Sequence, residues 1–332
     1  MKATRTTATL GLRAGDWVEV LSAPEILATL DDAQSLEGLP FMPEMLQYCG
    51  RRFRVYKSAH KTCDTIGTYA IRRMSGAVHL EGLRCDGEAH AGCQAGCLLY
   101  WKEAWLKRTK PGPATTDEPR STSTGGVEWA VLMKGTRVPT NPGEAERFRC
   151  QATDLLKFTT EVRRRGRWDP RLYIKDLTSG NVTLAEFVKY GLFAMVNAFT
   201  ERWLGYRYPH LCGRAGKQTP TAKLDLQAGE FVRVRSRDEI MATLGPNMKN
   251  RGLHFDVEMA PFCAMGSERV LTRVERIVDE KTGLLVELPN PCLILDGVTC
   301  SGLLSSSRMF CPRNIYPFWR EVWLERVDDT VS

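Results

Sequence analysis

The sequence lacks the segments and motifs that would assign it at once to a common functional class. Within its 332 residues, no stretch is apolar over the about 20 residues that a membrane-spanning helix needs. The first residues contain no apolar run that could form the core of a signal peptide, so we expect a reducing cytoplasm. A phosphate loop, a dinucleotide fingerprint, a zinc-protease helix and a serine nucleophile elbow are also missing. No motif therefore predicts a reaction.

Neither the composition nor the charge is extreme. Hydrophobic residues make up 43% of the chain and charged residues 26%, which is close to the average for soluble globular proteins. The net charge of +7 is compatible with an anionic partner, but such an excess is more often an ordinary solvated exterior. The length allows two or three domains, each with its own core.

An internal repeat is the strongest feature of the sequence. Four blocks in the N-terminal part align, in the same order, with four blocks in the C-terminal part. The aligned pairs are 12–30 with 226–244, 38–49 with 252–263, 80–87 with 295–302, and 101–108 with 319–326. Chance would not preserve order, register and chemistry in four blocks, so we predict one module written twice.

Each copy has the pattern of a small β-rich module. After a glycine turn, AGDWVEV and AGEFVRV alternate apolar and polar residues, as a half-buried strand does. Pro24–Leu30 and Asp238–Leu244 then have the composition of short helices. A series of short strands that begins with a glycine-led GD-x-V-x-V is similar to the small SH3-like barrels of KOW modules.

These patterns predict an α+β chain in which two SH3-like barrels are joined by a linker and a helical middle segment. The predicted parts are a cysteine-rich first module (12–108), a flexible linker (109–126), a mainly helical region (127–222) and a second module (223–328). The linker is inferred from its richness in Pro, Gly, Ser and Thr.

The clearest helix signal in the middle region is LAEFVKYGLFAMVNAFTERWL. Thr183 and Glu186 form a capping box at its start. Because the segment is apolar on most of its circumference, we expect this helix to be buried in a core. A helix that docks on a membrane surface or a partner is the alternative. Lys189, Glu201 and Arg202 are compatible with an ordinary packed helix.

Eleven cysteines, an odd number, are distributed over the chain, and six of them form three pairs at equivalent places in the two copies. The equivalent pairs are Cys49 with Cys263, Cys85 with Cys300, and Cys93 with Cys311. The fourth candidate differs between the copies, since it is Cys97 or Cys63 in the first and Cys292 in the second. In a reducing compartment, clustered cysteines suggest metal binding or catalysis rather than disulfides.

Converging thiolates repel one another unless a cation neutralises them, and four of them suit zinc or an iron–sulfur cluster. The segment CDGEAHAGCQAGC is rich in small residues that let the backbone wrap closely, and neither copy has the paired C-x-x-C knuckles of structural zinc. We therefore expect a [4Fe–4S] cluster, with zinc as the alternative. The candidate ligands are Cys49, Cys85, Cys93, Cys97, Cys263, Cys292, Cys300 and Cys311, with His60, Cys63 and His90 as possible substitutes.

The alternative interpretation is that some of these cysteines are core residues, because free cysteine packs as a small hydrophobe. Cys263 and Cys292 fit this alternative well, since their neighbours are apolar. Cys150 shows no partner in the sequence and is interpreted as a core residue. The histidines near the cysteines could equally be solvated side chains.

Two further patterns have both a structural and a functional interpretation. In WKEAWL and WREVWL, two tryptophans four residues apart are expected to close each barrel, and the intervening Glu103 and Glu321 could act as buried acids. The basic runs Arg51–Arg54, Glu161–Arg167 and 207–217 combine arginines with aromatic residues, as nucleic-acid-binding surfaces do. Nucleic-acid binding is the minority interpretation of these runs.

The strings GLHFDVEMAPFC, RVERIVDEKTG, CLILDGVTC and FCPRNIYPFWREVWLERV resemble a family of uncharacterised bacterial proteins with a cysteine-containing module of this kind. The resemblance covers the second copy fully and the first more loosely, since GCQAGCLLYW stands where the second copy has FCPRNIYPFW. It implies a module that ends in CPR-x-I-Y-P-x-W-R-E-x-W-L, and no activity.

Three hypotheses follow from the sequence. The first is a cytoplasmic metalloprotein whose cysteine site, expected to be iron–sulfur, serves a redox or biosynthetic role with a protein or small-molecule partner. The second is a zinc-stabilised adaptor that binds nucleic acid or protein without catalysis. The third makes the second copy a purely structural partner of an active first copy.

Overall fold

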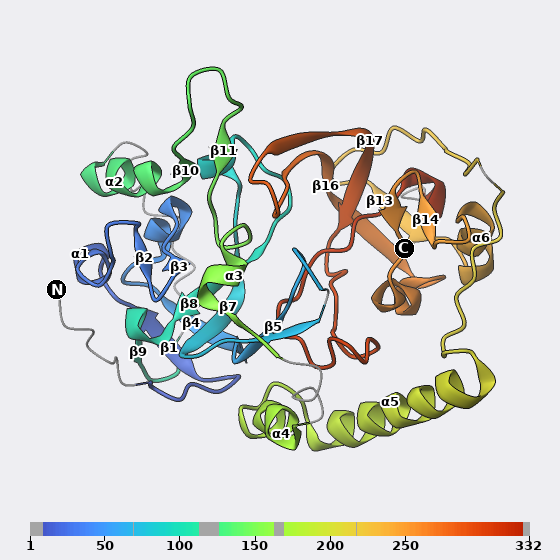
Figure 1. The fold of residues 1–332 in the computed structure, drawn as a ribbon, viewed down its shortest axis with the longest axis horizontal. Coiled ribbons are helices and arrows are strands. Elements are labelled where there is room, and N and C mark those ends of the chain that lie inside the picture. The colour runs from blue at the N-terminus through green and yellow to red at the C-terminus, as the bar shows by residue number, and fades with distance from the viewer. Residues whose placement is uncertain (1–8, 69, 113–125, 163–168, 217, 328–332) are drawn as a thin grey trace. The chain divides into compact units, whose positions relative to one another are not determined.

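The chain forms a mixed α+β fold that divides into two units (Figure 1). The computed structural model describes residues 9–68, 70–112, 126–162, 169–216 and 218–327. Unit 1 comprises residues 1–187, 278–285 and 310–313, and unit 2 comprises 188–277, 286–309 and 314–332. Most of the predicted flexible linker (109–126) lies outside the described residues.

Unit 1 is built on a curled five-stranded antiparallel sheet with the strand order β8-β7-β4-β1-β9. Its strands are β1 (Trp17–Val20), β4 (Arg52–Ser58), β7 (Ala77–Arg84), β8 (Leu98–Lys102) and β9 (Leu106–Arg108). The predicted alternation in β1 is confirmed, because Val18 and Val20 are fully buried whereas Trp17 and Glu19 are only partly buried. This alternation directs one face of the sheet into the core.

Short elements surround this sheet. They are α1 (Ala23–Leu27), β2 (Ser35–Leu36), β3 (Leu39–Pro40), η1 (Pro43–Tyr48), β5 (Lys61–Cys63), β6 (Ile71–Arg73), η2 (Glu88–His90), η3 (Glu103–Trp105), α2 (Val127–Gly135), β10 (Arg137–Val138), β11 (Arg147–Phe148), α3 (Leu155–Phe158), β12 (Thr160–Glu161) and α4 (Pro170–Thr178). The middle region therefore contains short strands as well as helices. β12 pairs with β6, which places this part of the region within unit 1.

Unit 2 contains a second curled antiparallel sheet, of four strands in the order β17-β16-β13-β18. Its elements are β13 (Phe231–Val234), α6 (Arg237–Thr243), β14 (Lys249–Asn250), β15 (Leu253–His254), η5 (Val257–Phe262), β16 (Ser267–Val278), β17 (Leu285–Leu295), η6 (Glu321–Trp323) and β18 (Leu324–Arg326). The two curled sheets are compatible with two barrel-like modules, and their SH3-like identity stays a prediction.

The paired tryptophans lie in the two cores, as predicted. Trp101, Trp105, Trp319 and Trp323 are all fully buried. In unit 1, the indole N–H of Trp105 donates to the hydroxyl of Thr29 (3.1 Å). In unit 2, the indole N–H of Trp323 donates in the same way to Thr243 (2.8 Å). Each sheet is thus closed by a large aromatic pair that is also fixed by a hydrogen bond.

The glutamates between the tryptophans have a structural role in both units. Glu103 accepts hydrogen bonds from the backbone N–H groups of Gly11 (2.9 Å) and Leu12 (3.2 Å). Glu321 accepts equivalent bonds from Leu224 (2.9 Å) and Leu226 (3.1 Å). Both carboxylates therefore anchor the segment that leads into the first strand of their sheet.

The long helix α5 (Leu184–Leu204) is not buried as predicted. Asn197 is its only fully buried residue among those described, and the side chains of Phe199 and Trp203 are 60% and 70% exposed. An apolar circumference indicates that a helix needs a partner, but it does not show that the partner lies in the same chain. Within the described part of the chain, no helix is long and apolar enough to span a bilayer.

Candidate metal centre

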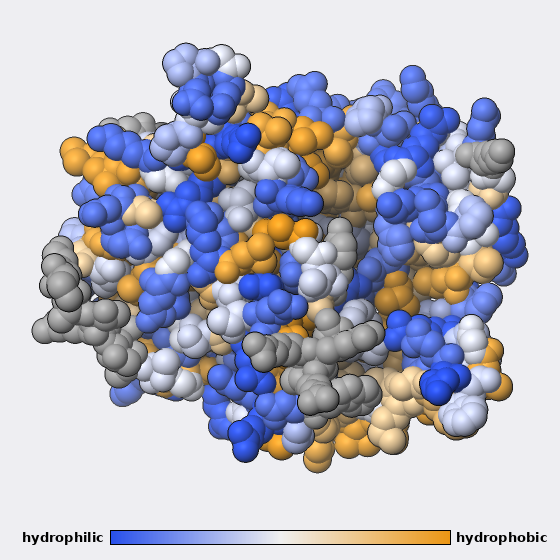
Figure 2. All heavy atoms as spheres, in the orientation of Figure 1, coloured by the Kyte–Doolittle hydropathy of each residue, from blue (hydrophilic) through white to orange (hydrophobic). Residues whose placement is uncertain are grey.

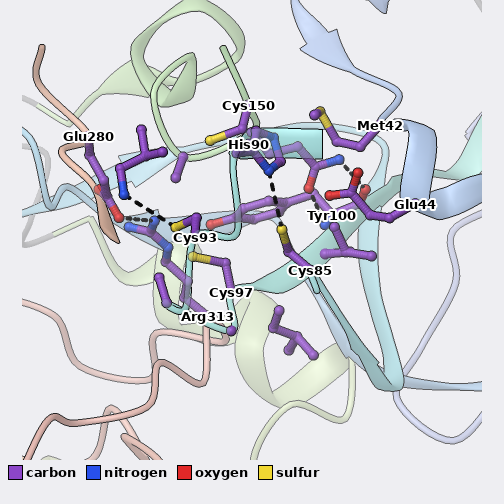
Figure 3. A pocket seen from close by; sticks show the side chains of 17 residues that line it. Met42, Glu44, Cys85, His90, Cys93, Cys97, Tyr100, Cys150, Glu280 and Arg313 are labelled. Atoms are coloured by element: carbon purple, nitrogen blue, oxygen red, sulfur yellow. Dashed lines mark hydrogen bonds and ion pairs between the residues drawn. The ribbon is translucent and has the colours of Figure 1, made fainter. Parts of the chain in front are cut away.

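Unit 1 contains a cavity of about 40 Å³ where five segments of the chain meet (Figure 3). Its walls come from η1, from the loop between β7 and β8, from the start of β8, from residues 150–152, and from residues 278–280 with Arg313. This volume has room for an ion and one or two water-sized groups. Four cysteines line the cavity, namely Cys85, Cys93, Cys97 and Cys150.

Three potential metal ligands converge on one side of this cavity. Glu44 comes from η1, Cys85 follows β7, and His90 ends η2. One ligand atom from each of the three lies within 4.8 Å of the others, and Cys85 Sγ is 3.8 Å from His90 Nδ1. Among the described residues, this is the one group of three cysteine, histidine or acidic side chains that comes so close together.

The carboxylate of Glu44 is buried, and its oxygens have no hydrogen-bond partner. Its side chain is 2% exposed, and neither oxygen accepts a hydrogen bond. Burial raises the pKa of Glu44 to about 7. A buried polar group without a partner is costly, so this carboxylate is poised either to hold a proton or to receive a cation.

Burial also keeps the other two groups uncharged. It lowers the pKa of His90 to about 4, and it raises the pKa of Cys85 well above the usual value for a thiol. His90 Nε2 has no hydrogen-bond partner. A neutral imidazole is the form that binds metal, and a bound cation would favour the thiolate and carboxylate forms of Cys85 and Glu44.

Glycine permits the tight loop that carries Cys85 and His90. Gly87 has a φ of +78°, and a Cβ at this position would lie 1.9 Å from the carbonyl oxygen of Cys93. The same loop is fixed by hydrogen bonds from the N–H of Cys85 to Cys97 O (2.8 Å) and from the N–H of His90 to Gly87 O (2.9 Å). The small residues noted in the sequence thus bring three cysteines and one histidine of this loop to one cavity.

The thiols of the cavity are held in an environment of low polarity. Burial raises the pKa of both Cys97 and Cys150 to about 12. Cys93 Sγ accepts a hydrogen bond from the backbone N–H of Val278 (3.3 Å). Neutral thiols are therefore expected at this site unless a cation is present.

A buried arginine completes the wall of the cavity. Arg313 is 3% exposed and donates to Glu280 Oε1 (3.0 Å) and to Thr65 Oγ1 (2.5 Å). Its guanidinium group lies on the side of the cavity where Figure 3 shows Cys93 and Cys97. This positive charge opposes the effect of burial on Cys97, but the pKa of that thiol still rises to about 12.

The predicted ligands of the first module are only partly brought together. Cys85, Cys93, Cys97 and His90 line the cavity, whereas Cys49 follows η1 and packs against the hydrophobic core. Burial raises the pKa of Cys49 to about 12, which fits a core thiol.

The possible substitutes His60 and Cys63 lie in or beside β5, away from the cavity lining. His60 Nε2 is 3.1 Å from a carboxylate oxygen of Asp176. The backbone N–H of Cys63 donates to the sulfur of Cys311 (3.2 Å). Cys311 therefore belongs to unit 1, although its sequence lies in the second repeat.

The remaining predicted ligands, Cys263, Cys292 and Cys300, lie in unit 2. Cys263 packs against the core of this unit, and Cys292 is 2% exposed within a smaller apolar cluster. The backbone N–H of Cys300 bonds to Ile315 O (2.8 Å). Within the described residues of unit 2, no group of three ligands comes together.

Two residues of the site were not predicted from the sequence. Cys150 lies beyond the first module, and nothing in its neighbourhood pointed to the cavity. Glu44 had a signal, because it aligns with Glu258 in the second copy of the repeat. That alignment places a buried acid in each module, but it does not distinguish a ligand from a structural carboxylate.

The two aligned glutamates differ in how they are satisfied. Glu258 accepts hydrogen bonds from the N–H groups of Leu304 and Ser305 (both 2.8 Å) and from the hydroxyl of Ser301 (2.8 Å). Glu44 accepts none. The same position is thus a completed structural contact in unit 2 and an unsatisfied acceptor in unit 1.

The basic runs are largely neutralised where they are described. Four of their arginines lie within ion-pair distance of acids, in the pairs Arg52–Glu19 (3.2 Å), Arg54–Glu81 (3.7 Å), Arg207–Glu201 (3.0 Å) and Arg214–Asp238 (3.7 Å). Residues 163–168 of the second run lie outside the described part of the chain. Nucleic-acid binding stays a prediction.

The resemblance to a bacterial family also stays a prediction. The site is a compact Glu–Cys–His group beside a cavity lined by four cysteines. Comparison with protein-family models, with curated proteins and with solved structures finds no match.

Proposed function

We propose that unit 1 is a metal-binding module that holds a zinc ion through Glu44, Cys85 and His90. The observation that carries this proposal is the convergence of the three ligand atoms within 4.8 Å around a buried carboxylate that has no hydrogen-bond partner. Thiolate, imidazole and carboxylate are the three side-chain ligands that zinc takes in proteins.

A cation at this position would offset the energetic cost of burying the charged Glu44 carboxylate. It would pair with the Glu44 carboxylate, which otherwise needs a proton to be buried. It would also bind His90 in the neutral form that burial already favours. The metal thus satisfies in unit 1 what backbone N–H groups satisfy at Glu258 in unit 2.

Three protein ligands leave a fourth coordination position for a water or a substrate. This number of ligands is typical of catalytic rather than structural zinc, and such an ion polarises the group that it binds. The cavity beside the triad offers this position to a small ligand. A biosynthetic or hydrolytic role is therefore favoured over a purely structural one.

A second candidate is a [4Fe–4S] cluster held by Cys85, Cys93, Cys97 and Cys150. The observation that favours it is that these four cysteines, with the Arg313 cation, line one cavity. Their sulfurs do not form a tight group around a single point, which a mononuclear Cys₄ site would need. A multi-atom cluster spans larger separations, although the cavity of about 40 Å³ would have to widen to admit it, and it would give unit 1 a redox role.

The two units are proposed to be one SH3-like module written twice, of which the first binds metal and the second is structural. The shared strand arrangement, with β1 between β4 and β9 and β13 between β16 and β18, supports this. So do the matching hydrogen bonds of Trp105 and Trp323 to threonine hydroxyls.

Paired variants separate the zinc site from the cluster. With zinc at the triad, Glu44→Gln and His90→Gln reduce bound zinc to background, because each removes one of three ligands. Cys150→Ser leaves the zinc content unchanged, since Cys150 is not part of the triad. Metal is measured by mass spectrometry of the purified variants, and circular dichroism confirms that they are folded.

The repeat supplies the matched control. Glu258→Gln changes the aligned carboxylate in unit 2 and should leave bound zinc at the level of the unmodified protein. Loss of metal in Cys150→Ser with full retention in Glu44→Gln would overturn the zinc site and favour the cluster. Equal metal in all three variants would overturn both candidates.

A further inference from the structure

The outward face of α5 carries exposed apolar side chains that the metal centre does not use. Its side chains recur at helical spacing on one side of the helix and are 51–70% exposed. They are Val188, Leu192, Met195, Val196, Phe199 and Trp203. Figure 2 shows hydrophobic atoms along the lower edge of the view, where α5 runs in Figure 1. Contiguous apolar surface of this kind marks an interaction site.

The opposite face of α5 fixes the orientation of the helix within unit 2. Asn197 donates to Tyr208 O (2.7 Å) and accepts from the N–H of Tyr208 (2.8 Å). The rings of Phe193 and Tyr208 are 6.1 Å apart, and Glu201 pairs with Arg207 (3.0 Å). Because this face is bound to its own unit, the apolar face points away from it.

We infer that this face is a homodimer interface, in which α5 pairs with α5 of a second copy in antiparallel orientation. The six side chains expose on the order of 700 Å² in total, which approaches the about 800 Å² that each partner buries in a stable interface. A self-complementary patch is also what a twofold axis requires, since each copy contributes the same surface.

The sizes of the side chains favour the antiparallel orientation. A twofold axis between Met195 and Val196 places Trp203 of one copy opposite Val188 of the other. The same axis places Phe199 opposite Leu192. Large side chains thus meet smaller ones along the whole helix, which keeps the separation of the two helices even.

One cation at the rim of the face has a partner in the same orientation. Lys189 and Arg202 flank the apolar residues near opposite ends of the helix. The axis between Met195 and Val196 sets Lys189 of one copy level with Arg202 of the other, on opposite sides of the seam between the helices. It also brings Lys189 near Trp203 of the second copy, where a cation–π contact is favourable.

A membrane surface is a less suitable occupant. Helices that lie on a membrane carry many Lys and Arg residues on a hydrated polar face. The described helix α5 carries two cations, Lys189 and Arg202, and its far side is tied to its own unit through the hydrogen bonds of Asn197.

Light scattering coupled to size exclusion tests the interface on the full chain. At about 10 µM the unmodified protein is expected to have twice the mass of one chain. Phe199→Glu and Leu192→Lys each bury an unpaired charge twice in the dimer, so each should raise the dissociation constant by on the order of 100-fold. Val127→Glu, at a 79% exposed position on α2, is the control and should remain dimeric.

Mixing the two monomeric variants tests the orientation. In an antiparallel pair, Glu at position 199 of one variant faces Lys at position 192 of the other, so an equimolar mixture should recover the dimer. A monomeric unmodified protein, or a mixture that stays monomeric, would overturn the inference. Binding of the unmodified monomer to vesicles with anionic lipid, lost in Phe199→Glu, would overturn it in favour of a membrane surface.

Discussion

Replacement of Asp176 by alanine is expected to lower the free energy of unfolding of unit 1 by about 3–5 kcal/mol. Asp176 lies on α4 and is completely buried, as is Lys61 on β5. Lys61 Nζ is 2.5 Å from one carboxylate oxygen, and His60 Nε2 is 3.1 Å from the other. The substitution would leave the Lys61 ammonium group in the interior without its counter-ion.

The neighbours of Lys61 explain why the loss is so large. Its ammonium group lies 4.8 Å from the ring centroid of Tyr173 and 5.5 Å from that of Phe310. Aromatic rings attract a cation only weakly, and burial lowers the pKa of Lys61. The Asp176 carboxylate is the largest of the charged groups that oppose this lowering.

Urea denaturation followed by circular dichroism measures the effect of this substitution. The matched control is Glu81→Ala, which removes an ion pair with Arg54 whose side chains are 48% and 53% exposed. Exposed pairs contribute about 0–1 kcal/mol, so the control should unfold almost like the unmodified protein. An equal, small loss in both variants would contradict a stabilising role for the buried cluster.

Gly87→Ala is expected to abolish metal binding and to destabilise unit 1 by about 3 kcal/mol or more. The new Cβ would stand 1.9 Å from Cys93 O, which is backbone and cannot move aside. The loop must therefore open, and it is this loop that carries Cys85, His90 and Cys93 to the cavity. Bound metal and thermal unfolding of the purified variant measure the two effects.

Gly92→Ala is the control for backbone conformation. Gly92 has a similar φ of +75°, but a Cβ there would meet no atom within 4 Å. It should cost about 1–2 kcal/mol for the left-handed conformation alone and should keep its metal. If both variants retained metal, the described shape of the loop would be wrong.

Local patterns predicted the two β-rich modules well, because the alternation of apolar and polar residues along a strand can be seen in adjacent residues. Val18 and Val20 face the core as the alternation in AGDWVEV requires. The burial of Trp101 and Trp105 follows likewise from their spacing. Cys85, Cys93 and Cys97 could be grouped for the same reason, since one short loop carries all three.

The rest of the site depends on contacts between distant segments, which no local pattern encodes. Cys150 reaches the cavity from a segment more than fifty residues after Cys97. Cys49 was favoured because it aligns with Cys263, yet alignment reports position in the module and not the direction of the thiol. The sequence did not predict Glu44 as a ligand for a related reason. Its aligned partner Glu258 forms structural hydrogen bonds, so the alignment alone does not indicate metal binding.

Helix α5 shows a further limit of sequence patterns. Its hydrophobicity predicted burial in a core, but Phe199 and Trp203 are exposed. Hydrophobicity does not state whether the partner is the same chain or another molecule.

The most direct test of the account is the metal and sulfide content of the protein purified without oxygen, measured together with its absorption spectrum. The account predicts one zinc ion per chain, no acid-labile sulfide and no band in the visible. It also predicts that Cys85→Ser loses the ion and that Cys300→Ser, its counterpart in unit 2, keeps it. Iron with equal sulfide and a broad visible band would contradict zinc and establish a cluster. Protein that binds neither metal after reconstitution would contradict the metal centre itself.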